Sequence, residues 1–258
     1  MSAAPALLWD VPAPHGSCGP SQRSRSWLTS GGYPRPVPDD DANGDGHLAA
    51  GGFAPWLAQM EGARRGEHDA DVPCGTCTAC CRSSQFVHIG PDETDTLAHI
   101  PKALLFPAPR MPPGHVLLGY DERGHCPMLV DDACSIYQHR PRTCRTYDCR
   151  VFPAAGVAPD DDKPLIAGQV RRWRFGISTP AEQVAHDAVR AAAVFLRRDR
   201  GVLPPEVAPR NATQHAVLAV EVHEVFVRWD DAKGESAVAD PPAEVVVAEV
   251  MRRRSWRS

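Results

Sequence analysis

Eight of the nine cysteines lie between residues 74 and 149, and only Cys18 lies outside this span. The eight are Cys74, Cys77, Cys80, Cys81, Cys126, Cys134, Cys144 and Cys149. Single cysteines are common in protein cores as small hydrophobic residues, but core packing does not explain such a concentration. Thiolates are preferred ligands of zinc and of iron–sulfur clusters, so the sequence predicts that these eight residues bind metal.

The first four cysteines form the pattern C-x2-C-x2-C-C. A gap of two residues allows the intervening turn to place both sulfurs on one ion, and Gly75 eases the turn between Cys74 and Cys77. The adjacent residues Cys80 and Cys81 must send their side chains in different directions if the backbone is extended. We therefore expect one of these two to serve a different site from the other.

Eight thiolates are compatible with three kinds of site. They could hold two tetrahedral zinc ions, two four-iron clusters, or one four-iron cluster with four cysteines left for zinc or redox pairing. The spacing does not choose among them. The bacterial ferredoxin pattern requires a third pair of cysteines separated by two residues and a later Cys-Pro, whereas here the third cysteine is followed immediately by the fourth. The C-x3-C-x2-C spacing of radical S-adenosylmethionine enzymes also fails, because Ser84 stands at the third ligand position.

Basic residues and histidines accompany the cysteines. Cations stabilise an anionic thiolate site, and five arginines lie near the predicted ligands in sequence, namely Arg82, Arg140, Arg142, Arg145 and Arg150. We expect a structural hydrogen-bonding role for Arg145. Imidazole also binds zinc, and five histidines share the region, namely His88, His99, His115, His125 and His139. With eight thiolates none of them is required, and His125, beside Cys126, is the first to test.

The composition limits the fold and the partners. The chain has 258 residues with 26 Pro, 20 Gly and only 7% aromatic residues, so much of it cannot bury enough apolar surface to offset its ordering entropy. The net charge of −4 argues against nucleic acid or an anionic membrane as a partner. No segment has the composition of a signal peptide or a membrane span, which predicts a cytoplasmic protein in which clustered cysteines bind metal rather than form disulfides.

Three regions are expected along the chain. We expect a disordered leader at residues 1–68, with one docking helical turn near residues 53–60. A cysteine-cluster domain is expected at residues 69–178 and a helical extension at residues 179–258. Within the cluster domain we expect a short helix at 92–100, a hairpin joining 116–120 to 126–130, and a strand at 165–177. Helices are expected at 180–200, 212–229 and 242–254, as accessory packing.

The cysteine pattern resembles a known family. The segment Cys74-Gly-Thr-Cys77-Thr-Ala-Cys80-Cys81, followed by Cys126-Pro-Met-Leu and by the segment from Cys134 to Cys149, is similar to the YkgJ-type CxxCxxCC cysteine-cluster family, which is described as zinc- or iron-chelating. The same pattern is associated with flagellin lysine N-methylases, so the resemblance also implies a methyltransferase. No strand followed by a Gly-rich turn and a helix, as would bind S-adenosylmethionine, accompanies it.

The sequence therefore predicts a small, irregular α+β domain that is organised around metal rather than around a large apolar core, with folding coupled to metal binding. The leading functional interpretation is an intracellular iron–sulfur or zinc protein with a redox, electron-transfer or metal-handling role. Two alternatives remain: an enzyme that methylates protein lysine, and a zinc-stabilised module that binds a protein partner without catalysis.

Overall fold

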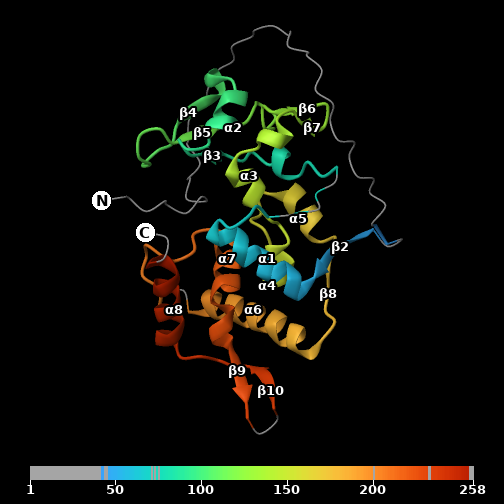
Figure 1. Ribbon diagram of the computed structural model, residues 1–258, viewed down its shortest axis with the longest axis vertical. Coiled ribbons are helices and arrows are strands. Elements are labelled where there is room, and N and C mark those ends of the chain that lie inside the picture. The colour runs from blue at the N-terminus through green and yellow to red at the C-terminus, as the bar shows by residue number, and fades with distance from the viewer. Residues whose placement is uncertain are drawn as a thin grey trace.

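The computed structural model describes residues 42, 43, 46–70, 72, 74, 76–199, 201–231 and 234–255. These residues form short helices and several small sheets, which confirms the α+β prediction (Figure 1). Residues 1–41 of the leader expected at residues 1–68, which include Cys18, lie outside the described residues. No helix in the described part of the chain is both long enough and apolar enough to cross a membrane.

The first described elements belong to the folded body rather than to a leader. Strand β2 (His47–Gly52) lies between β1 (Ala42–Asn43) and β8 (Trp173–Gly176), antiparallel to β1 and parallel to β8. Helix α1 (Phe53–Arg65) follows and ends at Gly66, whose φ of 76° is readily adopted by glycine. The prediction of a leader up to residue 68 is wrong for residues 47–65, because Phe53, Trp56 and Met60 are buried in the core.

A large apolar core occupies the lower part of Figure 1. It combines α1 with α4 (Val151–Ala155), α6 (Pro180–Arg198), α7 (Ala212–Val222) and α8 (Ala243–Ser255). Its largest fully buried side chains include Phe53, Phe152 and Phe226. The expectation that metal replaces a large core, with the C-terminal helices as accessory packing, is therefore wrong: these helices supply much of the core.

Local sequence explains the longest helix. Thr179 and Glu182 form a reciprocal capping box, in which the Thr179 hydroxyl accepts from the Glu182 backbone N–H at 3.1 Å, and Pro180 occupies the first helical position. Apolar residues at intervals of three and four, such as Ala188, Ala192 and Phe195, then lie on the buried face. The helix predicted at 180–200 is confirmed as α6.

Two segments differ from their predicted type. The predicted strand at 165–177 divides into helix α5 (Pro164–Val170) and strand β8, because Pro164 starts a helix at the point where a strand was expected. The predicted helix at 212–229 ends at Val222 and continues as a 3-10 turn, η4 (His223–Phe226), and a strand, β9 (Val227–Asp230). Strand β9 pairs antiparallel with β10 (Glu235–Val238).

A smaller unit carries most of the cysteine-rich sequence, in the upper part of Figure 1. Its three-stranded antiparallel sheet has the order β3 (Val87–Ile89), β5 (Val116–Leu118), β4 (Leu105–Pro107). A short hairpin, β6 (Leu129–Val130) with β7 (Ala133–Cys134), lies beside it. Helices α2 (Thr94–His99) and α3 (Arg142–Thr146) and the 3-10 turns η1 (Cys80–Arg82), η2 (Lys102–Leu104) and η3 (Tyr137–His139) complete the unit.

This unit has its own small core of Val87, Ile89, Ile100, Leu118, Met128 and Ile136. The short helix predicted at 92–100 is present as α2. The predicted hairpin is wrong in its pairing: the turn at Asp121–Gly124 forms, with Gly124 N–H donating to the Asp121 oxygen at 2.9 Å. The flanking strands, however, find other partners, β5 with β3 and β4, and β6 with β7. Burial of these strands against the small core therefore determines their pairing more strongly than the local turn sequence does.

A polar network inside the large core fixes the backbone on either side of Cys149. Asp148 and Arg150 form a buried ion pair at 2.8 Å, with both side chains less than 10% exposed. Trp56 Nε1 on α1 donates to Asp148 Oδ2 at 2.8 Å, and the Arg150 guanidinium donates to the Ala50 backbone oxygen at 3.1 Å. A buried ion pair is stable only when such additional partners satisfy it. The network therefore ties Cys149 to α1 and β2.

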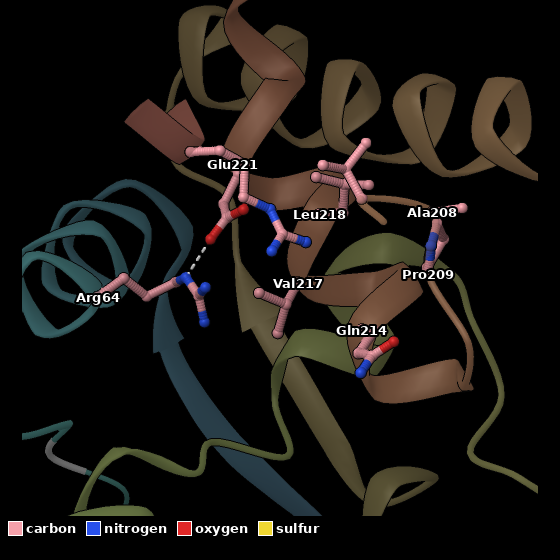
Figure 2. Close-up of a pocket in the computed structure, with 9 residues that line it drawn as sticks. Arg64, Ala208, Pro209, Gln214, Val217, Leu218 and Glu221 are labelled. Atoms are coloured by element: carbon pink, nitrogen blue, oxygen red, sulfur yellow. Dashed lines mark ion pairs between the residues drawn. The ribbon is translucent and has the colours of Figure 1, made fainter. Parts of the chain in front are cut away.

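A second ion pair joins α1 to α7. Arg64 and Glu221 pair at the side of a hollow that is lined also by Val217 and Leu218 (Figure 2). None of the residues that line this hollow is a cysteine. The pair therefore joins two helices beside a hollow that contains none of the cysteines.

Replacing Trp56 by Phe should destabilise the protein. The substitution removes a buried hydrogen bond to a charged group, worth about 1.5–3 kcal/mol, and leaves part of the indole volume empty. The matched control is Trp229→Phe on β9, where the side chain is 59% exposed and little should change. Denaturant unfolding of both variants measures the difference, and equal midpoints would show that the Asp148 network does not hold α1 in place.

Candidate metal centre

The two adjacent cysteines lie in a tight turn rather than in extended backbone. The Cys77 N–H donates to the Cys74 oxygen at 2.8 Å, and Cys80 and Cys81 then begin η1. The side chains of successive residues in a 3-10 helix point about 120° apart, because the helix has about three residues per turn. The separation of these two side chains was predicted from an extended backbone, and it follows here from a turn.

The Cys80 side chain belongs to a first set of four thiols, Cys74, Cys77, Cys80 and Cys149, named set one. Cys80 packs against the large core, which contains the buried residue Cys149. Burial raises the pKa of the Cys80 thiol well above its ordinary value, and the next contributions come from Cys149 and Cys74, followed by smaller ones from Cys81 and then Cys77. Burial likewise raises the pKa of Cys149 to about 12 and that of Cys74 to about 11.

The Cys81 side chain belongs to a second set, Cys81, Cys126, Cys134 and Cys144, named set two. The Cys126 N–H donates to the Cys81 oxygen at 2.7 Å, and the side chains of Cys126 and Cys134 pack against the smaller core. The pKa of Cys81 is raised to about 12, chiefly by burial and then by Cys126 and Cys134. The pKa of Cys144 is raised chiefly by burial, then by Cys126 and Cys81.

Hydrogen-bond donors already point at several sulfurs. Trp173 Nε1 on β8 donates to Cys149 Sγ at 3.2 Å. Backbone N–H groups of Met128 and Leu129 donate to Cys126, and that of Ile136 donates to Cys134, which in each case lowers the thiol pKa against the larger effect of burial. Such donors stabilise thiolate charge and tune a bound metal. Sequence spacing gave no signal for Trp173, which lies 24 residues beyond Cys149.

Two of the five predicted arginines act on the thiols. Arg140 lowers the pKa of Cys74, Cys134 and Cys144, and Arg150 lowers that of Cys74, each against the larger effect of burial. The other three arginines form ion pairs at the surface. Arg82 pairs with Asp132, Arg142 with Asp92, and Arg145 Nε lies 3.5 Å from Asp69 Oδ1.

The five histidines have partners other than the thiols. His125 Nε2 lies 3.4 Å from an Arg82 nitrogen, and His88 Nε2 lies 2.9 Å from His115 Nδ1. His99 and His139 stack on each other beside Asp95. This last group was not recognised as a site from the sequence, because His139 lies 40 residues beyond His99 and the three residues form no known motif.

The donor set fits a metal. Each set offers four thiols, which is the number that a tetrahedral zinc ion or a four-iron cluster requires. Burial and repulsion between thiols raise the pKa of thiols in both sets, and a cation within each set would offset both effects. Among the described residues, the three ligand atoms that lie within 4.8 Å of one another belong to Asp95, His99 and His139. No three sulfurs of either set lie that close in the described part of the chain, so the thiols of each set would have to move together to bind one ion.

Comparison with known proteins supports this chemistry. Residues 73–162 match the CxxCxxCC family model, which is described as a "putative zinc- or iron-chelating domain". The matched segment contains all eight cysteines and confirms the resemblance drawn from the sequence. No curated protein and no solved structure matches the chain. The match indicates a zinc- or iron-chelating role for this segment.

Metal content should not depend on the first 41 residues. A chain that begins at residue 42, and the full chain with Cys18→Ser, should each hold as much metal as the unaltered protein, since the two thiol sets are complete without Cys18. His125→Ala should behave in the same way, because His125 contacts Arg82. Elemental analysis of the purified proteins tests this, and metal loss in any of the three would show that a ligand has been missed.

Proposed function

We propose that this protein chelates metal at two four-thiolate centres, one formed by set one and the other by set two, and that each centre holds a zinc ion or an iron–sulfur cluster. The observation that supports the proposal is the difference between the neighbours of Cys80 and Cys81: after burial, Cys149 and Cys74 raise the pKa of Cys80 most, whereas Cys126 and Cys134 raise that of Cys81 most. The ligands would be Cys74, Cys77, Cys80 and Cys149 in one centre, and Cys81, Cys126, Cys134 and Cys144 in the other.

Independent features of the structure support the division. Cys80 packs against the large core, which includes Cys149, whereas Cys126 and Cys134 pack against the small core. The backbone donors at Cys126 and Cys134 have the arrangement that metal-bound cysteine turns use to stabilise thiolate charge. The two centres would be neighbours, because Cys74 and Cys77 also raise the pKa of Cys81, although less than Cys126 and Cys134 do.

The exposure of the ligands supports a role in exchange. Cys74 and Cys144, one in each set, are residues with surface exposure, although burial is the main cause of the raised pKa of both thiols, and Cys149 of set one is a buried residue. A centre with a ligand residue at the surface can pass metal or electrons to a partner protein without unfolding. The protein would then have a metal-handling or electron-transfer role in the reducing cytoplasm, where its thiols stay available for metal.

The proposal is tested by set-specific substitutions in protein purified without oxygen. Serine has the size of cysteine but binds soft metals poorly, so Cys149→Ser and Cys126→Ser should each abolish one centre and keep the other. Elemental analysis should then show about half of the original metal in each variant, and visible absorption with sulfide content separates a cluster from zinc. Full metal content in both variants, or its complete loss in both, would refute two independent centres.

Metal removal should affect the two parts of the molecule unequally. A strong chelator should unfold the smaller unit, whose core has only six buried apolar residues, because metal binding and folding are coupled in such units. Helices α6 and α7 should persist, since they pack in the large core. Hydrogen exchange measured with and without chelator would show this, and unchanged protection at Ile89 and Leu118 would contradict it.

A further inference from the structure

Three side chains outside the two thiol sets converge on the surface of the smaller unit. Asp95 and His99 are one helical turn apart on α2, and His139 reaches them from η3. Each offers one ligand atom, and these atoms all lie within 4.8 Å of one another. His139 Nδ1 lies 2.7 Å from Asp95 Oδ2.

The two imidazole rings are held in a fixed relation. They stack with their centroids 3.5 Å apart and their planes within 6° of parallel. His99 Nδ1 lies 2.8 Å from the Asp95 backbone oxygen, which orients that ring as a second hydrogen bond orients many metal-binding histidines. Specific contacts therefore hold the two imidazole rings in place.

The backbone beneath the group is also anchored. Ile100, directly after α2, and Ile136, directly before η3, are both buried in the small core. Thr96 of α2 donates from Oγ1 to the Arg140 oxygen at 3.4 Å, which joins the two segments a second time. The spacing between Asp95 and His139 is thus set by two packed elements.

The geometry points to a third metal site, separate from the thiols, in which Asp95, His99 and His139 bind a divalent transition-metal ion such as Zn²⁺, Ni²⁺ or Co²⁺. Two nitrogens and one carboxylate oxygen suit these ions, whereas Ca²⁺ and Mg²⁺ prefer all-oxygen sites and clusters prefer thiolates. Ligand atoms on a tetrahedral ion with bonds of about 2.0–2.2 Å are about 3.4 Å apart. The three atoms lie within 4.8 Å of one another in this structure, so binding would require the side chains to turn until they converge on the ion.

The exposure of the group decides how the ion is held. The side chains of Asp95, His99 and His139 are 70%, 41% and 37% exposed, respectively. Water therefore fills the remaining coordination positions, as in sites with three protein ligands. The bound ion would exchange readily with solution, unlike an ion held by four thiolates. The site lies on the same small unit as set two, so it places an exchangeable ion on the metal-handling part of the molecule.

Calorimetric titration of Zn²⁺ into full-length protein tests the site. The protein is first loaded at its thiol centres and desalted, and its tightly bound metal is measured. The unaltered chain should then take up one further, weaker zinc ion. His99→Ala, His139→Ala and Asp95→Asn should each weaken that step by roughly tenfold or more, while the tightly bound metal stays unchanged. The matched control His68→Ala changes an exposed histidine outside the group and should bind as the unaltered chain does.

Two results would overturn this inference. One is the absence of any zinc uptake beyond the tightly bound metal. The other is uptake that Asp95→Asn and both histidine variants leave unchanged. Asp95→Asn preserves the shape of the side chain, and circular dichroism confirms the fold of each variant. Because the thiol-bound metal is measured on the same samples, a failure of the thiol centres is distinguished from a failure of this site.

Discussion

Cys80 and Cys81 are consecutive in the chain, and the turn in which they lie sends their side chains to different neighbours. That difference underlies the proposed division of the eight cysteines into two groups of four. Eight ionised thiols in one place would repel one another strongly in a medium of low dielectric constant. In the proposed arrangement, two groups, each with its own cation, would distribute that charge.

Each thiol set packs against a different apolar core. Set one borders the large core through Cys80 and Cys149, and the buried network of Asp148, Arg150 and Trp56 fixes the backbone around it. Set two borders a core of six residues through Cys126 and Cys134. A core of that size cannot offset the entropy of ordering its many loops, so the smaller unit has the greater need of metal. The two centres therefore couple differently to folding, although their ligands are alike.

The sequence predicted the chemistry better than the architecture. Cysteine spacing is a local signal, so the family resemblance and the divergence of the Cys80 and Cys81 side chains could be inferred from it. The proposed grouping of Cys149 with Cys80, and of Cys126 with Cys81, depends on packing over 69 and 45 residues of chain and leaves no local mark. The size of the large core was underestimated, because abundant Pro and Gly lowered the mean hydropathy of the whole chain, whereas the C-terminal helices have apolar faces that are buried. The capped helix after Thr179 was predictable because its signals are local.

The division of the thiols is tested most directly by measuring which cysteines become reactive when one ligand is lost. Protein purified without oxygen is treated with iodoacetamide, and the alkylated cysteines are identified by mass spectrometry in Cys80→Ser and Cys81→Ser. Loss of Cys80 should expose Cys74, Cys77 and Cys149 while set two stays protected. Loss of Cys81 should expose Cys126, Cys134 and Cys144 while set one stays protected. The same pattern of alkylation in both variants would contradict the division into two centres.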